Sequence, residues 1–147
     1  MEIQENLELI NNLIQSKYLE TAKNCNLTLE QFHILIELYY HYGSMISDEI
    51  LPLSIGEIAE DIGNAPHTLS ERIKRLEKKD LIKKVRDEKD HRITRVLLSP
   101  KGHSLMENIE KKSNYIFIYK ALEKMDETIL NNLLDGLKQL KMNLSNE

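Results

Sequence analysis

The chain is poor in several residue types, and each scarcity excludes a class of protein. There is no Trp, and only 2 Phe occur among 147 residues, so Leu and Ile must build the hydrophobic core. The lone cysteine, Cys25, cannot form an intrachain disulfide, which argues against a disulfide-stabilised secreted domain. No apolar run approaches the ~20 residues that cross a bilayer, and the segment MEIQENLELINN lacks the basic start of a signal peptide. We therefore expect a cytoplasmic protein with no membrane partner.

Catalytic and metal-binding motifs are also missing. The sequence has no CxxC or HExxH cluster, no glycine-rich phosphate loop and no nucleophile–base pattern, so we expect neither an enzyme nor a cofactor. Two His/Glu pairs at i, i+4 spacing, His33 with Glu37 and His103 with Glu107, support a metal-responsive alternative. Isolated pairs of this kind are, however, common on solvated helices. No metal ligand is predicted. Cys25 supports a redox-responsive alternative if its pKa is lowered, although few basic residues lie near it in the sequence.

The charge is small overall but unevenly distributed. The net charge of −4 argues at first against a nucleic-acid partner. Between His67 and Lys101, however, 12 Lys and Arg stand against 6 Asp and Glu, a balance of +6, whereas the rest of the chain carries −10. A local excess of this kind indicates a phosphate-binding face on an acidic body. The alternative is that charges of opposite sign merely segregate onto solvated helix faces.

Apolar residues at helical spacing predict two helices before the basic segment. The first runs from about Ile3 to Lys23 and the second from about Leu29 to Tyr42. Thr28 and Gln31 have the spacing of a capping box at the start of the second helix. Gly43 is expected to end it.

Two shorter helices follow in the basic half. Ser54 and Glu57 predict a second capping box, and the apolar positions from Ile55 to Ile62 share one helical face. Gly63 is expected to stop this helix, and Pro66 fits the first turn of the next.

A hairpin pattern comes next. The runs Leu81–Asp87 and Ile93–Ser99 are rich in β-branched and aliphatic residues, with a charged turn at Glu88–Arg92. Leu53–Ile55 is a candidate third strand. Helix, turn, helix and hairpin form the layout of a winged helix-turn-helix, a mostly α fold with a small β element. This unit places its second helix in the DNA major groove and its hairpin along the backbone or minor groove.

The two ends of the chain are helical and strongly apolar. A long helix pattern follows Pro100 as far as Leu122, and Asp126 is expected to cap a last helix whose apolar stripe runs from Ile129 to Leu140. These faces exceed what the winged helix alone can cover. We therefore expect a homodimer formed through the terminal helices. The alternative is that they pack only on their own subunit.

The block from Leu29 to Gly102 resembles the MarR family of bacterial regulators. The phrases that carry the likeness are LTLEQFHILIEL, LSIGEIAEDIG, TLSERIKRLEKKDLI and DEKDHRITRVLLSPKG. The last resembles the family's wing pattern, here Asp90, Arg92, Leu98, Ser99 and Gly102. The sequence departs from the family pattern in three places. Asp80 stands where Gly is usual, and the loop at residues 44–52 is longer than usual. Ala65 stands where a Ser or Thr cap is common, which leaves Asn64 as an alternative cap.

The resemblance implies one domain over residues 1–147. Residues 29–102 form the DNA-binding winged helix, and residues 1–24 and 103–147 supply the dimerisation helices. It implies a sequence-specific transcriptional regulator, a repressor or an activator, that binds a pseudo-palindromic operator in double-stranded DNA as a homodimer. In such regulators a small ligand or an oxidant often relieves DNA binding, and we expect a repressor released by a small ligand. The remaining alternatives are a winged helix that coats DNA with little sequence choice and one that contacts protein.

Residues on the outward face of the second short helix and at the wing tip are the candidate DNA contacts. They are His67, Thr68, Ser70, Glu71, Arg72, Lys74, Arg75, Lys78, Lys89, His91 and Arg92. Glu71 either accepts from a cytosine amino group or pairs with Lys74 or Arg75 on the helix surface. Arg92 is expected to enter the minor groove, with Asp90 orienting its guanidinium through a bidentate pair. The alternative for that pair is a turn salt bridge with no role in DNA binding.

The effector site is the least specified feature. In the family such pockets lie where the winged helix meets the dimerisation helices. The residues able to line one here are Tyr18, Phe32, His33, Tyr39 and Tyr42. Each of them also fits ordinary core or surface packing.

Overall fold

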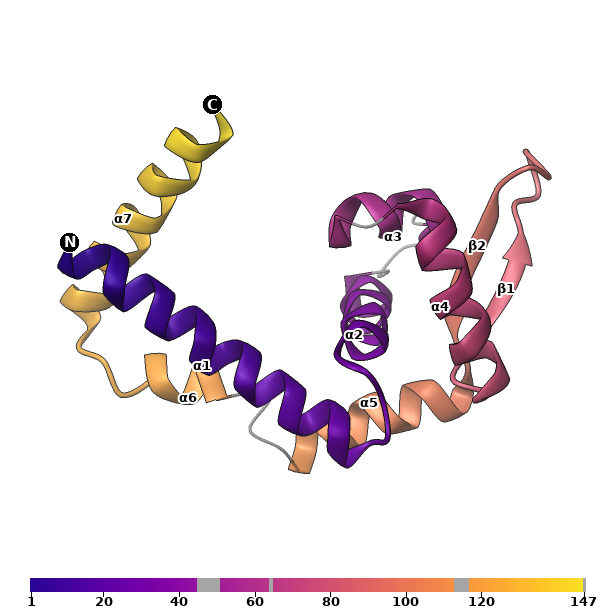
Figure 1. The fold of residues 1–147 in the computed structure, drawn as a ribbon. Helices are drawn as coiled ribbons and strands as arrows, with labels where there is room; N and C mark the ends of the chain where they lie inside the picture. The colour runs from indigo at the N-terminus through magenta and orange to yellow at the C-terminus, as the bar shows by residue number, and fades with distance from the viewer. Residues whose placement is uncertain (45–50, 64, 113–116, 147) are drawn as a thin grey trace. The chain divides into compact units, whose positions relative to one another are not determined.

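The computed structural model describes residues 1–44, 51–63, 65–112 and 117–146. The elements follow the order α1 (Glu2–Asn24), α2 (Leu29–Ser44), α3 (Ile55–Ile62), α4 (Pro66–Lys78), β1 (Ile82–Arg86), β2 (Thr94–Leu98), α5 (Pro100–Lys112), α6 (Phe117–Leu122) and α7 (Glu127–Ser145) (Figure 1). The chain forms two compact units, Met1–Ser113 and Asn114–Glu147, which are described separately below. The predicted mostly α winged helix lies within the first unit.

The start of α2 follows the predicted capping box, but its end does not follow the prediction. The Gln31 backbone N–H donates to Thr28 Oγ1 at 3.2 Å, and the Thr28 N–H donates to Gln31 Oε1 at 3.1 Å. Gly43, by contrast, does not end the helix, because its backbone stays helical and α2 continues to Ser44. A glycine inside a helix costs only about 1 kcal/mol, which packing along the rest of the helix can offset.

Local sequence signals set the helix-turn-helix. Ser54 caps α3, and the reciprocal bond from Glu57 completes the predicted capping box. Gly63 ends α3 in the left-handed conformation at φ 74°, where a side chain would be strained. Pro66 opens α4 as predicted. The N-cap of α4 is Ala65, which makes no side-chain cap bond, and Asn64 lies outside the described residues.

The wing is an antiparallel hairpin of β1 and β2, with Ile82 opposite Leu98 and Arg86 opposite Thr94. The third segment expected before α3 is present as a single bridge, in which Ser54 pairs with Arg95. The Val96 N–H also donates to the Leu53 carbonyl at 2.9 Å. The hairpin packs beside α4 and projects past it (Figure 1).

Aliphatic side chains from the helix-turn-helix, the wing and α5 meet in one core. Each of its large side chains is at most 2% exposed. They are Phe32, Ile34, Leu35, Ile58, Leu69, Ile73, Leu76, Ile82, Val96 and Met106. This set uses one of the two Phe and is otherwise aliphatic apart from Met106, as the composition required. Because α4 contributes three of these side chains, its buried stripe fixes which of its faces turns outward.

The exit of the wing packs tightly against the turn between α4 and β1. The Ser99 hydroxyl donates to the Asp80 carbonyl at 2.5 Å and accepts from the Gly102 N–H at 2.9 Å. A Cβ on Gly102 would lie 2.0 Å from the Leu81 carbonyl oxygen, so the close approach requires glycine. Asp80 itself adopts φ 57°, the left-handed conformation that explains why glycine is usual at this position in the family.

The second unit contains α6 and α7. The single long helix predicted after Pro100 is described as α5 and α6, on either side of residues 113–116, and its residue Ile116 lies outside the described part. Asp126 caps α7 as predicted, accepting from the Thr128 and Ile129 backbone N–H groups. Along the described stretches of the chain, no helix is long and apolar enough to cross a membrane.

Candidate nucleic-acid interface

The outward face of α4 is polar, basic and accessible. The buried stripe of Leu69, Ile73 and Leu76 holds the helix against the core, so the residues between these positions face solvent. The exposed ones among the predicted contacts are His67, Glu71, Lys74, Arg75 and Lys78. Three of these five are Lys or Arg, and a fourth is His. The face therefore offers cationic donors along nearly the whole length of the helix.

Glu71 is paired on the helix surface. Its Oε1 accepts from Lys74 Nζ at 3.0 Å, and both side chains are more than half exposed. The hydrogen bond and charge of Lys74 lower the pKa of Glu71. In the free protein, Glu71 therefore pairs with Lys74 on the helix surface, which is one of the two expected roles. An exposed pair of this kind is weak enough to exchange for a base contact.

The two hydroxyl residues of the first turns are partly committed to other groups. Ser70 Oγ donates to the Pro66 carbonyl at 3.0 Å, and Thr68 Oγ1 lies 3.4 Å from His67 Nε2. Both residues are half-buried. Each hydroxyl has lone pairs left to accept from a ligand, but neither is a fully exposed donor.

Arg72 does not join the exposed face. It is half-buried, and its Nη1 is shielded from solvent with no hydrogen-bond partner among the described residues. The pKa of Glu30 on α2 is lowered mainly by a hydrogen bond from its own backbone and further by the Thr28 hydroxyl and the Arg72 charge. The guanidinium therefore lies at the α2–α4 contact, and we remove Arg72 from the DNA-contact set. Packing against α2 decides this direction, because helical spacing alone leaves Arg72 near the edge of the outward face.

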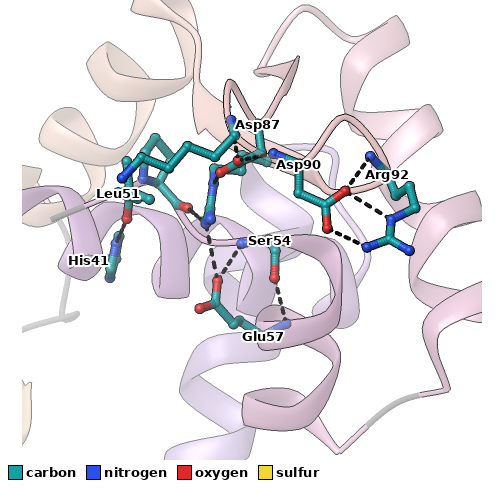
Figure 2. Close-up of polar contacts among 10 residues, drawn as sticks. His41, Leu51, Ser54, Glu57, Asp87, Asp90 and Arg92 are labelled. Atoms are coloured by element: carbon teal, nitrogen blue, oxygen red, sulfur yellow. Dashed lines mark hydrogen bonds and ion pairs between the residues drawn. The ribbon is translucent and has the colours of Figure 1, made fainter.

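The wing tip has the predicted geometry. Arg92 Nε and Nη2 donate to the two carboxylate oxygens of Asp90 at 3.0 Å each, and the Arg92 backbone N–H adds a third bond at 3.1 Å (Figure 2). The pair lowers the pKa of Asp90 and raises that of Arg92. The Arg92 side chain is 90% exposed. A charged guanidinium is therefore held at the tip of the hairpin, beside exposed Lys89 and His91.

The hairpin holds a charged cluster at the end of its ladder next to the turn, which the sequence pattern did not predict. Asp87 is only 7% exposed, and its Oδ2 accepts from Arg95 Nε at 2.5 Å. Arg95 also donates from Nη1 to the Pro52 carbonyl at 2.7 Å, and the same nitrogen lies 3.6 Å from Glu57 Oε2. The Arg95 hydrogen bond and those from the Asp90 and Lys89 backbone lower the pKa of Asp87 to about 2. The signal in the sequence was an Asp at the end of one strand and an Arg in the facing strand.

The predicted effector residues separate into two places. Tyr18 makes edge contacts with the rings of Phe32 and His33, and Phe32 is fully buried in the core. Burial lowers the pKa of His33. Tyr39 instead contacts α5, where its hydroxyl donates to Glu110 at 2.5 Å and its ring contacts His103. The side chain of Tyr42 lies outside the described part.

Neither stimulus-sensing alternative gains support. Burial raises the pKa of the Cys25 thiol, which lowers the fraction of reactive thiolate at neutral pH. His103 Nδ1 lies 3.6 Å from Glu107, a surface pair. In the described residues no three His, Cys, Asp or Glu side chains come close enough together to hold a metal ion.

Comparison with known proteins gives the chain its family. A family model described as transcriptional regulator SarA/Rot matches residues 16–109. The chain belongs to the SarA/Rot family of transcriptional regulators. The match runs from the second half of α1 through the helix-turn-helix and wing into α5, so it includes every candidate DNA contact.

Individual relatives of this SarA/Rot family protein agree. YsmB of Bacillus subtilis, an uncharacterised HTH-type transcriptional regulator, is 28% identical over 116 residues, which are 78% of this chain and 73% of that one. S. aureus MepR, solved in a DNA-binding conformation, is 22% identical with a TM-score of 0.77 over 97% of this chain and 98% of that one. AbsC, a MarR family regulator from Streptomyces coelicolor, is 19% identical with a TM-score of 0.74 over 99% and 93%. The MarR resemblance and the winged-helix fold are thus confirmed, and the chain is a DNA-binding transcriptional regulator.

Proposed function

We propose that this regulator binds a pseudo-palindromic operator as a homodimer, with α4 in the major groove and the wing tip in the minor groove. The observation that carries this is the joint exposure of the α4 face and of Arg92 on one winged helix. MepR, which shares the fold, has also been solved as a DNA complex, at 22% identity, a TM-score of 0.72 and coverage of 95% and 96%. The contact set is His67, Thr68, Ser70, Glu71, Lys74, Arg75, Lys78, Lys89, His91 and Arg92, with Asp90 as the residue that orients Arg92.

The homodimer is supported by apolar side chains that the single chain leaves exposed. On α1 they include Ile3, Leu9, Ile10 and Leu13, each at least half exposed, and on α7 Ile129, Leu134, Met142 and Leu144. None of the described residues of α7 is buried. Apolar stripes of this length are typical of association surfaces. A two-fold dimer would present two α4 helices about one helical turn of DNA apart.

We propose that the protein acts in the cytoplasm as a repressor and that a small molecule releases it from DNA. Occupation of a promoter by a dimer excludes polymerase without requiring any activating contact. The aromatic cluster of Tyr18, Phe32 and His33 at the α1–α2 contact is the place where a ligand would change the spacing of two winged helices in the dimer. We propose no catalytic role for this chain.

Fluorescence anisotropy on the DNA upstream of the protein's own gene, with excess nonspecific competitor, tests the proposal. We expect binding that survives competitor and prefers its site by ~10³-fold or more. Arg92→Ala should raise Kd about fivefold to a hundredfold, the usual range for a lost arginine contact. Lys23→Ala, which removes one exposed charge at the end of α1, is the matched control and should leave Kd unchanged. An unaltered Kd for Arg92→Ala would refute the wing contact.

The second candidate function is DNA coating with little sequence choice, favoured by the same run of lysines and arginines along α4 and the wing. Both functions predict a steep loss of affinity with salt, about −0.9 in slope for each neutralised phosphate. Only the specific regulator retains its preferred site under competitor. Complete loss of binding to all tested fragments under competitor, with tight binding in its absence, would decide for coating.

A further inference from the structure

Arg95 joins the two sides of the wing to a segment that is distant in the sequence. It lies in β2, and its guanidinium bonds Asp87 at the end of β1 and the Pro52 carbonyl in the segment before α3. The same Nη1 lies 3.6 Å from Glu57, whose carboxylate accepts the Ser54 N–H in the α3 capping box at 2.7 Å. The wing is thereby tied to the segment before α3 and to the first turn of α3 by one side chain.

Asp87 organises the other side of the same cluster. Its Oδ1 accepts the backbone N–H groups of Lys89 and Asp90, at 2.9 and 2.8 Å, while its Oδ2 faces Arg95. These two bonds shape the turn that leads to Arg92. One carboxylate therefore couples the conformation of the wing tip to the attachment of the hairpin to α3.

The cluster is built to hold a geometry and not to meet a ligand. The Arg95 side chain is only 14% exposed and that of Asp87 only 7%, whereas the Arg92 side chain is 90% exposed. Charge-assisted bonds in such a shielded position are stronger and more directional than exposed ones. Arg95 directs Nε and Nη1 at groups of its own chain, and its side chain is mostly shielded, so it adds little to the charge that DNA would meet.

We propose that Asp87 and Arg95 are positioning residues that set the spacing between the wing tip and α4, and so allow both to engage DNA at once. This inference rests on the proposed function, because it assumes that Arg92 contacts DNA. The helix-turn-helix supplies the mechanical link: α3 packs on α4, and the cluster fixes the hairpin to the start of α3. Without the cluster, β1 and β2 keep their ladder, but the hairpin is held to the helices by fewer bonds.

The test is a double-mutant cycle between the cluster and the wing tip. Asp87→Asn/Arg95→Met removes both charges together, so no unpaired buried charge remains, and the amide that replaces the carboxylate keeps an oxygen for the two backbone donors. Arg92→Ala is made in the native chain and in this background. Circular dichroism and thermal unfolding establish that each variant is folded at the assay temperature. Arg95→Lys, which keeps a positive charge opposite Asp87, serves as a milder variant and should give an intermediate Kd.

We expect the paired substitution to raise Kd for the operator about tenfold, most of what an arginine contact supplies. Arg92→Ala should then cost much less in this background than in the native chain. Hydroxyl-radical footprints should lose protection in the minor groove at the wing, while dimethyl sulfate protection of the major groove persists. An equal cost of Arg92→Ala in both backgrounds would overturn the positioning role. No effect of Arg92→Ala in the native chain would instead refute the wing contact itself, and the inference with it.

Discussion

Gly102→Ala tests the close contact that joins the wing to α5. Gly102 is the second residue after Pro100 opens that helix, and its missing side chain lets the helix start against the turn after α4. An added Cβ would meet the Leu81 carbonyl oxygen at 2.0 Å, its carbon at 2.9 Å and the Leu81 Cα at 3.3 Å. All three are backbone atoms, so no side-chain rotation relieves the overlap. The helix must move away by about 1 Å or more, in a core that is otherwise close-packed.

The magnitude follows from the bonds that such a movement breaks. The Ser99 N–H donates to the Leu81 carbonyl at 3.0 Å, and the Ser99 hydroxyl links the Asp80 carbonyl to the Gly102 N–H. Each buried hydrogen bond contributes about 1 kcal/mol, and overpacking strain adds about 1–3 kcal/mol. We therefore expect Gly102→Ala to lower the free energy of unfolding by about 4–6 kcal/mol, a large part of the roughly 5–15 kcal/mol of a typical domain.

Urea unfolding followed by circular dichroism measures the change. The matched control is Gly56→Ala in α3, where the added Cβ would meet only Ser54 Oγ at 3.8 Å. That substitution should be neutral or stabilise by up to about 1 kcal/mol, because alanine loses less backbone entropy in a helix. A loss below about 1 kcal/mol for Gly102→Ala would show that α5 and the turn can separate freely, and would refute the reasoning.

Two further predictions concern assembly and pH. Deletion of residues 126–144, which removes α7 and its cap, should abolish the dimer in sedimentation-velocity runs; a dimer that persists would place the interface elsewhere. Asp87→Asn should remove part of the acid sensitivity of folding, as measured by the urea midpoint at about pH 7, 4 and 2.5. The pKa of Asp87 lies at about 2, below its ordinary 3.8, so the carboxylate stabilises the folded state above about pH 4 and loses that effect as the pH falls through 2. Equal acid sensitivity of the native protein and the Asp87→Asn variant would contradict this role.

Local signals in the sequence predicted much of this fold. The capping box of Ser54 and Glu57, the left-handed stop at Gly63 and the cap at Asp126 all depend on groups within three or four residues, so the chain order alone specifies them. The Asp90–Arg92 pair at the wing tip belongs to the same class, because its partners are two residues apart. Gly43 is an exception, because it was expected to end α2 and the helix continues to Ser44.

The contacts that the sequence could not specify join distant segments. Arg72 lies on the same helix as Lys74 and Arg75, yet packing against α2 turns it away from the exposed face. Arg95 meets Pro52 across 43 residues of chain, and Gly102 meets Leu81 through backbone atoms that no sequence pattern names. The sequence by itself thus determined the helices, their caps and the wing-tip pair, because these interactions are short in range. Only the tertiary structure decided which charges face outward and which hold the wing, because burial and direction depend on neighbours that folding brings together.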